Sequence, residues 1–164
     1  MKLQDSGERR EFNTGAVRDV AEGKGRCDLM PLVNIGKLMH DEILIGIGHY
    51  VHVGDESYVE NALKRFIHLV YPTVYEAMLE VAKHYEDGAV KYSPRNWEKG
   101  INLSVYVDSG IRHYFKFMRG DNDEPHGRAF VWNMLGLLWT HENRPEMNDL
   151  PFGEVKSELI PTKI

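Results

Sequence analysis

This chain has one cysteine, no long apolar run and no excess of positive charge. Its single cysteine, Cys27, excludes an internal disulfide framework. No apolar run reaches the ~18 residues of a membrane span, and the polar start MKLQDSGERREF contains no signal-peptide core, so we expect a cytoplasmic protein with no membrane partner. The formal net charge of −5 argues against a general nucleic-acid binder, which needs a cationic excess, but it allows a local basic patch.

Length and composition indicate one domain with a helical core. The 164 residues, of which 42% are hydrophobic, suffice for one core but not for two. We expect an all-α fold of about five helices, divided into an irregular basic arm (1–28), a helical core (29–142) and an extended tail (143–164). The polar, proline-containing tail is of a kind that wraps a neighbouring subunit, so we expect a homo-oligomer.

Apolar residues recur at three- and four-residue intervals in several segments, which predicts amphipathic helices. Asp55 suits the N-cap of one helix, and Thr73 with Glu76 forms a capping box for the next, which Gly88 should end. The segment 43–53 fits either a buried helix or a strand. The remaining segments are predicted helices: one from Pro31, then 56–70, 73–87, 104–119 and 124–142.

The arm 1–28 alternates cations with glycines and has neither a helical nor a strand period. It fits a disordered leader, or an arm that folds over a phosphate-bearing ligand. The second interpretation follows because glycines allow close backbone approach and guanidinium groups match phosphate oxygens. The candidate phosphate-binding residues are Arg9, Arg10, Arg18, Lys24 and Arg26.

Two further segments carry candidate ligands. Glu80 and His84 lie four residues apart on the predicted helix 73–87, which suits either a divalent cation or a surface pair. The loop that follows contains cations and aromatic side chains, as a nucleotide-binding lip requires, although Trp97 alone can also pin such a loop to the core. The candidates in this loop are Lys91, Arg95, Asn96, Trp97 and Lys99.

The segment 104–142 holds the densest polar chemistry. Ser104 is a good N-cap, and Asp108 with Arg112 has the spacing of an intrahelical ion pair. His113 lies on a neighbouring stripe that can face a cleft. The turn 121–126 places Asp123, Glu124 and His126 together, although acidic residues at a helix start also serve as caps. Asn133 falls on a helix that is apolar nearly all round, so it needs a hydrogen-bond partner or a ligand.

Three ordered blocks of this sequence resemble a known family. They are SGERREFNTGAVRDVAEGKGRCDLMPL, HYEDGAVKYSPRNWEKG and DSGIRHYFKFMRGDNDEPHGRAFVWNMLGLLW. Together they are similar to the phage-encoded family of dATP/dGTP diphosphohydrolase N-terminal domains. The resemblance implies a small all-α enzyme akin to MazG-like nucleotide pyrophosphohydrolases. Such an enzyme, in the cytoplasm of the host cell, would use Mg²⁺ or a similar ion to remove pyrophosphate from purine deoxynucleoside triphosphates.

These observations lead to a metal-dependent nucleotide hydrolase as the first hypothesis. We expect Glu80, His84, Asp123 and Glu124 to hold one or two divalent ions, and Glu124, His113 and His126 to act in catalysis. Mg²⁺ or Mn²⁺ is expected, and the histidines also suit Co²⁺ or Zn²⁺. The cations of the arm and loop, with Asn96, Trp97 and Asn133, would bind the substrate. The alternative is a non-catalytic nucleotide- or protein-binding factor, because Ala129 follows His126 where MazG-like enzymes carry a carboxylate.

Overall fold

The structure, a computed structural model, describes residues 7–158 and is helical, as the sequence predicts. The described part contains seven α-helices, where about five were expected, together with three short 3-10 helices and one two-stranded sheet. The α-helices are α1 (Leu32–Met39), α2 (Glu42–Val53), α3 (Glu56–Val70), α4 (Val74–Lys91), α5 (Leu103–Arg119), α6 (His126–Asn143) and α7 (Pro151–Glu158). The other elements are β1 (Arg9–Glu11), β2 (Val17–Asp19), η1 (Cys27–Leu29), η2 (Asn96–Lys99) and η3 (Pro145–Met147).

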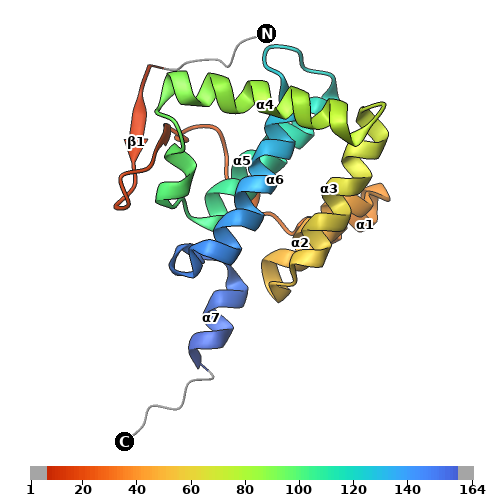
Figure 1. Cartoon of the computed structure of the whole chain (residues 1–164). Coiled ribbons are helices and arrows are strands. Elements are labelled where there is room, and N and C mark those ends of the chain that lie inside the picture. The colour runs from red at the N-terminus through yellow and green to blue at the C-terminus, as the bar shows by residue number, and fades with distance from the viewer. Residues whose placement is uncertain (1–6, 159–164) are drawn as a thin grey trace, which may run out of the picture.

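Helices α5 and α6 form the centre of the molecule (Figure 1). A short turn joins them, so the two helices pack side by side in opposite directions. Gly110 makes the close approach possible, since a Cβ at this position would lie 2.5 Å from Met134 Cε and 3.3 Å from Asn133 Cβ. The central pair therefore places polar residues of both helices close to one another, as with Ser109 of α5 and Asn133 of α6, which line the same cavity.

Helices α1 to α3 pack along one side of this pair (Figure 1). Phe66 of α3 is buried against Phe130 of α6, with ring centroids 4.6 Å apart. The segment 43–53 is the helix α2, whose N-cap Asp41 accepts hydrogen bonds from the backbone of Ile43 and Leu44. Gly48 has no side chain because α1 leaves no room for one: an added Cβ would lie 2.7 Å from the backbone nitrogen of Val33.

Helix α4 crosses one end of α6 (Figure 1) and is longer than the sequence predicts. Its start is confirmed, because Thr73 accepts a hydrogen bond from Glu76 N at 3.2 Å. Its predicted end at Gly88 is wrong, since the helix continues to Lys91. The last turn is held by Asp19, which accepts hydrogen bonds from Lys91 Nζ at 2.6 Å and from Tyr92 Oη at 3.0 Å. These contacts offset the ~1 kcal/mol that a glycine costs within a helix.

The arm forms a β-hairpin, not an irregular segment. Strands β1 and β2 pair antiparallel, with Arg10 opposite Arg18. Thr14 at the tip of the hairpin donates to Gly100 O at 2.5 Å, which fastens the hairpin to the segment between η2 and α5. Strands of three residues are too short to give a detectable period, so they cannot be predicted from the sequence pattern.

Of the tail 143–164 that was predicted to be extended, Pro145–Met147 and Pro151–Glu158 are helical, and residues 159–164 lie outside the described part. Leu150 and Phe152 are buried, and α7 packs against α2. Asp149, just before α7, accepts hydrogen bonds from the backbone nitrogen and hydroxyl of Ser104. Ser104 therefore does not cap α5 as predicted; it lies inside that helix, and Asp149 satisfies the free backbone group. None of the helices in the described part is both long and apolar enough to span a membrane.

Candidate functional site

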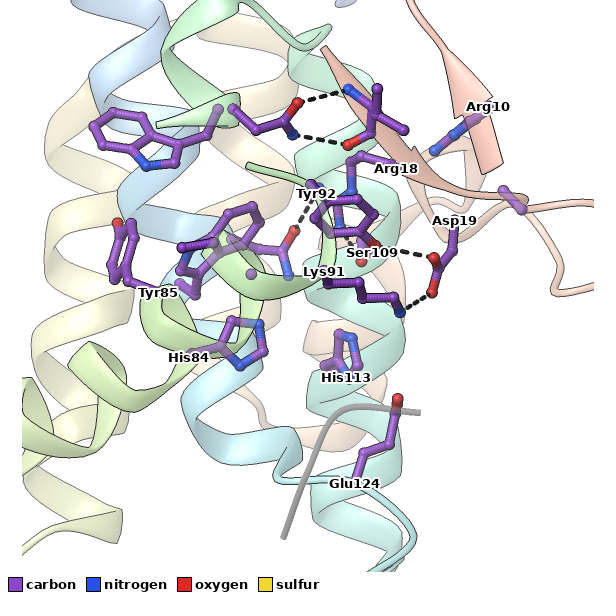
Figure 2. A pocket seen from close by; sticks show the side chains of 18 of the residues that line it. Arg10, Arg18, Asp19, His84, Tyr85, Lys91, Tyr92, Ser109, His113 and Glu124 are labelled. Atoms are coloured by element: carbon purple, nitrogen blue, oxygen red, sulfur yellow. Dashed lines mark hydrogen bonds and ion pairs between the residues drawn. The ribbon is translucent and has the colours of Figure 1, made fainter. Parts of the chain in front are cut away.

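One cavity of about 570 Å³ lies between the hairpin, α4, η2, α5 and α6 (Figure 2). Its volume is in the range of small-molecule sites in proteins. The N-terminal arm, the end of α4 with the loop that follows it, and the α5–α6 pair all contribute residues to it. The lining comprises Arg10, Val17, Arg18, Asp19, Val20, Ala21, Lys24, His84, Tyr85, Gly88, Ala89, Lys91, Tyr92, Ser93, Pro94, Arg95, Asn96, Trp97, Ser109, Arg112, His113, Lys116, Glu124, Trp132 and Asn133.

The cavity is strongly cationic although the whole chain is acidic. Seven lysine and arginine residues line it, against two carboxylates, Asp19 and Glu124. Some of these cations are paired, since Lys91 lies 2.6 Å from Asp19 and Arg112 forms an ion pair with Asp108. The excess still favours an anionic ligand, because low-dielectric walls concentrate the field of the charges that line them.

Arg18 is surrounded by neutral hydrogen-bonding and aromatic groups. Its guanidinium donates to Asn133 Oδ1 at 3.3 Å and to Ser109 Oγ at 3.1 Å. It also lies 5.2 Å from the ring centroid of Trp132. Within residues 7–158 no carboxylate forms an ion pair with it. Burial lowers the pKa of Arg18 from its usual value. A cation that is held by neutral groups and partly stripped of water is suited to an anion from outside.

Arg10 completes this part of the wall. Its Nε is buried and has no hydrogen-bond partner among the described residues. Burial and the neighbouring Arg18 lower its pKa. Two guanidinium groups that destabilise each other would both be stabilised by one polyanion, such as a phosphate chain.

Asn96 and Asp19 hold the hairpin at the cavity. The Asn96 side-chain amide accepts from Val17 N at 2.9 Å and donates to Val17 O at 2.8 Å, so it pairs with β2 as a neighbouring strand would. Asp19 binds both Lys91 and Tyr92. Asn96, a predicted substrate-binding residue, lines the cavity, but both polar groups of its amide are occupied by the hairpin backbone.

Aromatic side chains cover another part of the wall. Trp97 packs edge-on against Trp139, with centroids 4.9 Å apart, and against Tyr85 at 5.8 Å. Tyr85 in turn contacts Trp132. Trp97 therefore both anchors its loop to the core and borders the cavity, which combines the two roles that its sequence context left open.

His84 faces this cavity and is buried, with 7% of its surface exposed. The surface pairing with Glu80 that its spacing allowed is thus not formed. Burial, together with Arg128, Arg18 and Lys91, lowers the pKa of His84 to about 3, so the imidazole is neutral at pH 7. Its Nδ1 has no hydrogen-bond partner in the described part of the chain. Figure 2 shows His84 and His113 at one level of the cavity, with Lys91 above them and Glu124 below.

His113 belongs to a chain of hydrogen-bonded groups. Its Nδ1 lies 2.9 Å from Nδ1 of His126, and His126 Nε2 lies 2.8 Å from Asp123 Oδ1. Burial and the neighbouring His126 lower the pKa of His113 well below its usual value. The hydrogen bond from His126 lowers the pKa of Asp123 to about 2. His126 itself is almost fully buried and stands behind His113, outside the lining of the cavity.

Two groups of side chains in the described part have the donors and the spacing to hold a metal ion. The first is His113, Glu124 and His126, and the second is Asp121, Asp123 and His126; in each, the ligand atoms lie within 4.8 Å of one another. Glu80 and His84 belong to neither group. Glu80 contacts Lys83 and, at 3.8 Å, Arg128.

Several predicted ligand-binding residues lie outside the cavity lining. Arg9 pairs with Asp19 at 3.1 Å and lies over the Tyr92 ring. Arg26 makes two hydrogen bonds to Asp28, at 2.8 and 2.6 Å. Lys99 is exposed. The structure does bring together the other predicted ligand-binding residues at one cavity: Arg10, Arg18, Lys24, Lys91, Arg95, Asn96, Trp97 and Asn133.

Sequence reasoning missed several residues of the wall. Ser109, Arg112 and Lys116 lie with the predicted His113 on one face of α5, at the three- and four-residue spacing that was used to find apolar stripes. Applying this spacing to polar residues would have identified them. Asp19 and Trp132 had no comparable signal, because their roles depend on segments distant in sequence.

The comparisons with known proteins give one match. The family model described as dATP/dGTP diphosphohydrolase, N-terminal, matches residues 59–150. No curated protein and no solved structure matches the chain. The matched range covers α4, η2, α5 and α6, which supply most of the cavity wall, whereas the hairpin with Arg10 and Arg18 lies outside it.

Proposed function

Because this chain belongs to the dATP/dGTP diphosphohydrolase, N-terminal, family, we propose that its cavity binds a purine deoxynucleoside triphosphate and hydrolyses it to the monophosphate and pyrophosphate. The observation that carries the proposal is the pair Arg10 and Arg18, two cavity-lining guanidinium groups without an ion-pair partner among the described residues. The family description names the nucleotides, and this cavity supplies charge of the opposite sign.

The cationic wall would bind the triphosphate. Arg10, Arg18 and Lys24 lie on the hairpin side, and Lys91 lies at the end of α4. Guanidinium groups bind phosphate oxygens in a bidentate manner and are preferred where such oxygens must be oriented. Arg112 and Lys116 extend the same field along α5.

The aromatic wall would receive the base. Tyr85, Trp97 and Trp132 present ring surfaces to the cavity, and stacking of a base on such a ring contributes roughly 1–3 kcal/mol. Stacking tolerates either purine, in agreement with a family description that names both dATP and dGTP.

The reaction requires water to attack the α-phosphorus, after which the bond to the bridging oxygen breaks and pyrophosphate leaves. The cations that hold the β- and γ-phosphates would stabilise the charge that develops on pyrophosphate. Burial lowers the pKa of His84 and of His113, so either imidazole in its neutral form would offer one hydrogen-bond donor and one acceptor beside the phosphates. A divalent ion, when bound, supplies an acidified water and further neutralises the phosphate charge.

Hydrolysis of a panel of nucleoside triphosphates tests the proposal. The full chain is incubated with each nucleotide and Mg²⁺, Mn²⁺, Co²⁺ or Zn²⁺, and the products are separated by chromatography. We expect dAMP or dGMP with pyrophosphate, and no product in the presence of a chelator. Absence of turnover with every nucleotide and metal would contradict the enzyme function.

The alternative is a nucleotide-binding factor without catalysis. It would show saturable binding of dATP or dGTP that a chelator does not affect, and no product. The phage setting, the host-cell cytoplasm and the homo-oligomer stay predictions from the sequence.

A further inference from the structure

The side chains of His113, His126 and Glu124 converge at the wall of the cavity. One ligand atom of each lies within 4.8 Å of those of the other two. His113 and Glu124 line the cavity, whereas His126 is buried directly behind them. Two imidazoles and a carboxylate at this spacing form a typical donor set for a divalent metal ion.

The hydrogen bond between His126 and Asp123 is an independent indication. His126 Nε2 donates to Asp123 Oδ1 at 2.8 Å, which leaves the lone pair of a neutral His126 on Nδ1. That Nδ1 is the atom 2.9 Å from His113 Nδ1. Histidines that bind metals usually donate their other ring N–H to a carboxylate or carbonyl, which fixes the tautomer and the ring orientation.

We propose that His113, His126 and Glu124 form a binding site for one divalent transition-metal ion, with Asp123 as the residue that positions His126. The site deepens the proposed function, since the ion would lie beside the phosphates of the nucleotide. It also replaces the ligands Glu80 and His84 that the sequence indicated.

The second group, on the other side of the His126 ring, is a weaker candidate. Its Asp121 accepts two hydrogen bonds from Arg119, one of them at 2.7 Å. Its Asp123 lies 3.4 Å from Lys116 Nζ and accepts the hydrogen bond from His126. An ion bound there would have to displace these partners, the Asp123–His126 hydrogen bond among them, whereas an ion in the inner group would replace the His113–His126 contact and keep the Asp123–His126 hydrogen bond.

The donor set predicts which metals bind. Imidazole nitrogen suits Mn²⁺, Co²⁺ and Zn²⁺ better than Mg²⁺, which prefers oxygen ligands and keeps its water. Three protein ligands leave coordination positions open, and these would face the cavity. We therefore expect Co²⁺ and Zn²⁺ to bind more tightly than Mg²⁺ in the absence of any nucleotide.

Metal titration of the nucleotide-free full chain tests the site. Co²⁺ is added while visible absorption is recorded, and the affinities for Co²⁺, Zn²⁺ and Mg²⁺ are measured by calorimetry. We expect one ion per chain and a Co²⁺ spectrum typical of nitrogen ligands. Glu124→Gln and His113→Ala should each weaken Co²⁺ binding at least ~10-fold, and Asp123→Asn about 10-fold through His126. Thermal unfolding checks that each variant folds; if His113→Ala does not fold, Glu124→Gln carries the test.

Asp121→Asn is the matched control, because Asp121 belongs to the outer group alone. It should leave the Co²⁺ affinity unchanged. Loss of binding in Asp121→Asn with normal binding in Glu124→Gln would overturn the assignment, and so would failure of the wild type to bind Co²⁺ or Zn²⁺. If the wild type binds the metal but hydrolyses no nucleotide, only the proposed function is contradicted. If the wild type hydrolyses nucleotides but Glu124→Gln binds Co²⁺ with unchanged affinity, only the metal site is contradicted.

Discussion

Arg18 of β2 donates a hydrogen bond from Nη1 to Asn133 Oδ1 of α6 at 3.3 Å, across 115 positions of sequence. The contact joins the N-terminal hairpin to the central helix. It also gives the buried Asn133 the partner that its position requires, together with Ala129 O at 2.8 Å. The amide oxygen orients the guanidinium without neutralising it, so the charge stays available for a ligand.

Replacement of Arg18 by glutamine should weaken nucleotide binding. A hydrogen bond to a charged group contributes about 1.5–3 kcal/mol, so we expect the Kd of a non-hydrolysable dATP or dGTP analogue to rise about 10- to 100-fold. Calorimetry measures the change. Lys64→Ala serves as the control, because Lys64 is exposed on α3 and pairs only with Glu60 within the described chain. Equal affinities in wild type and Arg18→Gln would exclude Arg18 from the phosphate site.

Replacement of Asn96 by alanine should release the hairpin from the cavity. The change leaves the N–H and C=O of Val17 without their partners, which costs about 1–3 kcal/mol of unfolding free energy. Hydrogen exchange should accelerate at residues 9–19, and nucleotide affinity should fall with it. Asn143→Ala removes one exposed hydrogen bond and is the matched control. Unchanged exchange in the hairpin would show that Asn96 does not hold it.

Two glycine substitutions should have opposite effects on stability. Gly88 lies within α4 and has no atom within 4 Å of an added Cβ, so Gly88→Ala should stabilise the protein by about 1 kcal/mol. Gly48→Ala would place a Cβ 2.7 Å from backbone and should destabilise it by about 1–3 kcal/mol. Denaturant unfolding measures both. Destabilisation by Gly88→Ala would instead indicate that α4 ends at Gly88.

Stability should fall as the pH is lowered, partly through His84. Its folded-state pKa of about 3 lies below the usual value of 6.5, so between these values the unfolded state binds a proton that the folded state does not. The stability is complete above pH 6.5 and is lost toward pH 3, by about 1.4 kcal/mol per pH unit for one proton. We measure the free energy of unfolding against pH in the presence of a chelator. Between pH 3 and 6.5 the slope for His84→Gln should be smaller than that of the wild type by the equivalent of one proton. An identical slope would mean that His84 titrates normally in the folded protein.

Local signals predicted the starts of α3 and α4. Asp55 and Thr73 cap the helices that follow them, because a cap depends only on residues within one turn. The end of α4 was mispredicted for the opposite reason: Asp19, 72 positions from Lys91, holds the last turn. Likewise, the backbone N–H and C=O of Val17 in β2 are bonded by the side chain of Asn96, 79 positions away, which no periodicity can indicate.

The sequence indicated polar residues that lie close together in the structure, whereas their roles stay predictions. The sequence identified His113, Glu124 and His126 by the density of polar groups, and these residues do converge. It could not distinguish them from Glu80, whose carboxylate contacts Lys83 and Arg128. The distinction depends on which face of each helix meets the cavity, and that is set by the packing of α4 against α6.

A crystal structure of the full chain with Mn²⁺ and a non-hydrolysable dGTP analogue tests the central claim most directly. We predict phosphate oxygens within hydrogen-bond distance of Arg10 and Arg18, and the base against the aromatic wall of Tyr85, Trp97 and Trp132. A nucleotide bound elsewhere on the protein, with the cavity unchanged, would contradict the account.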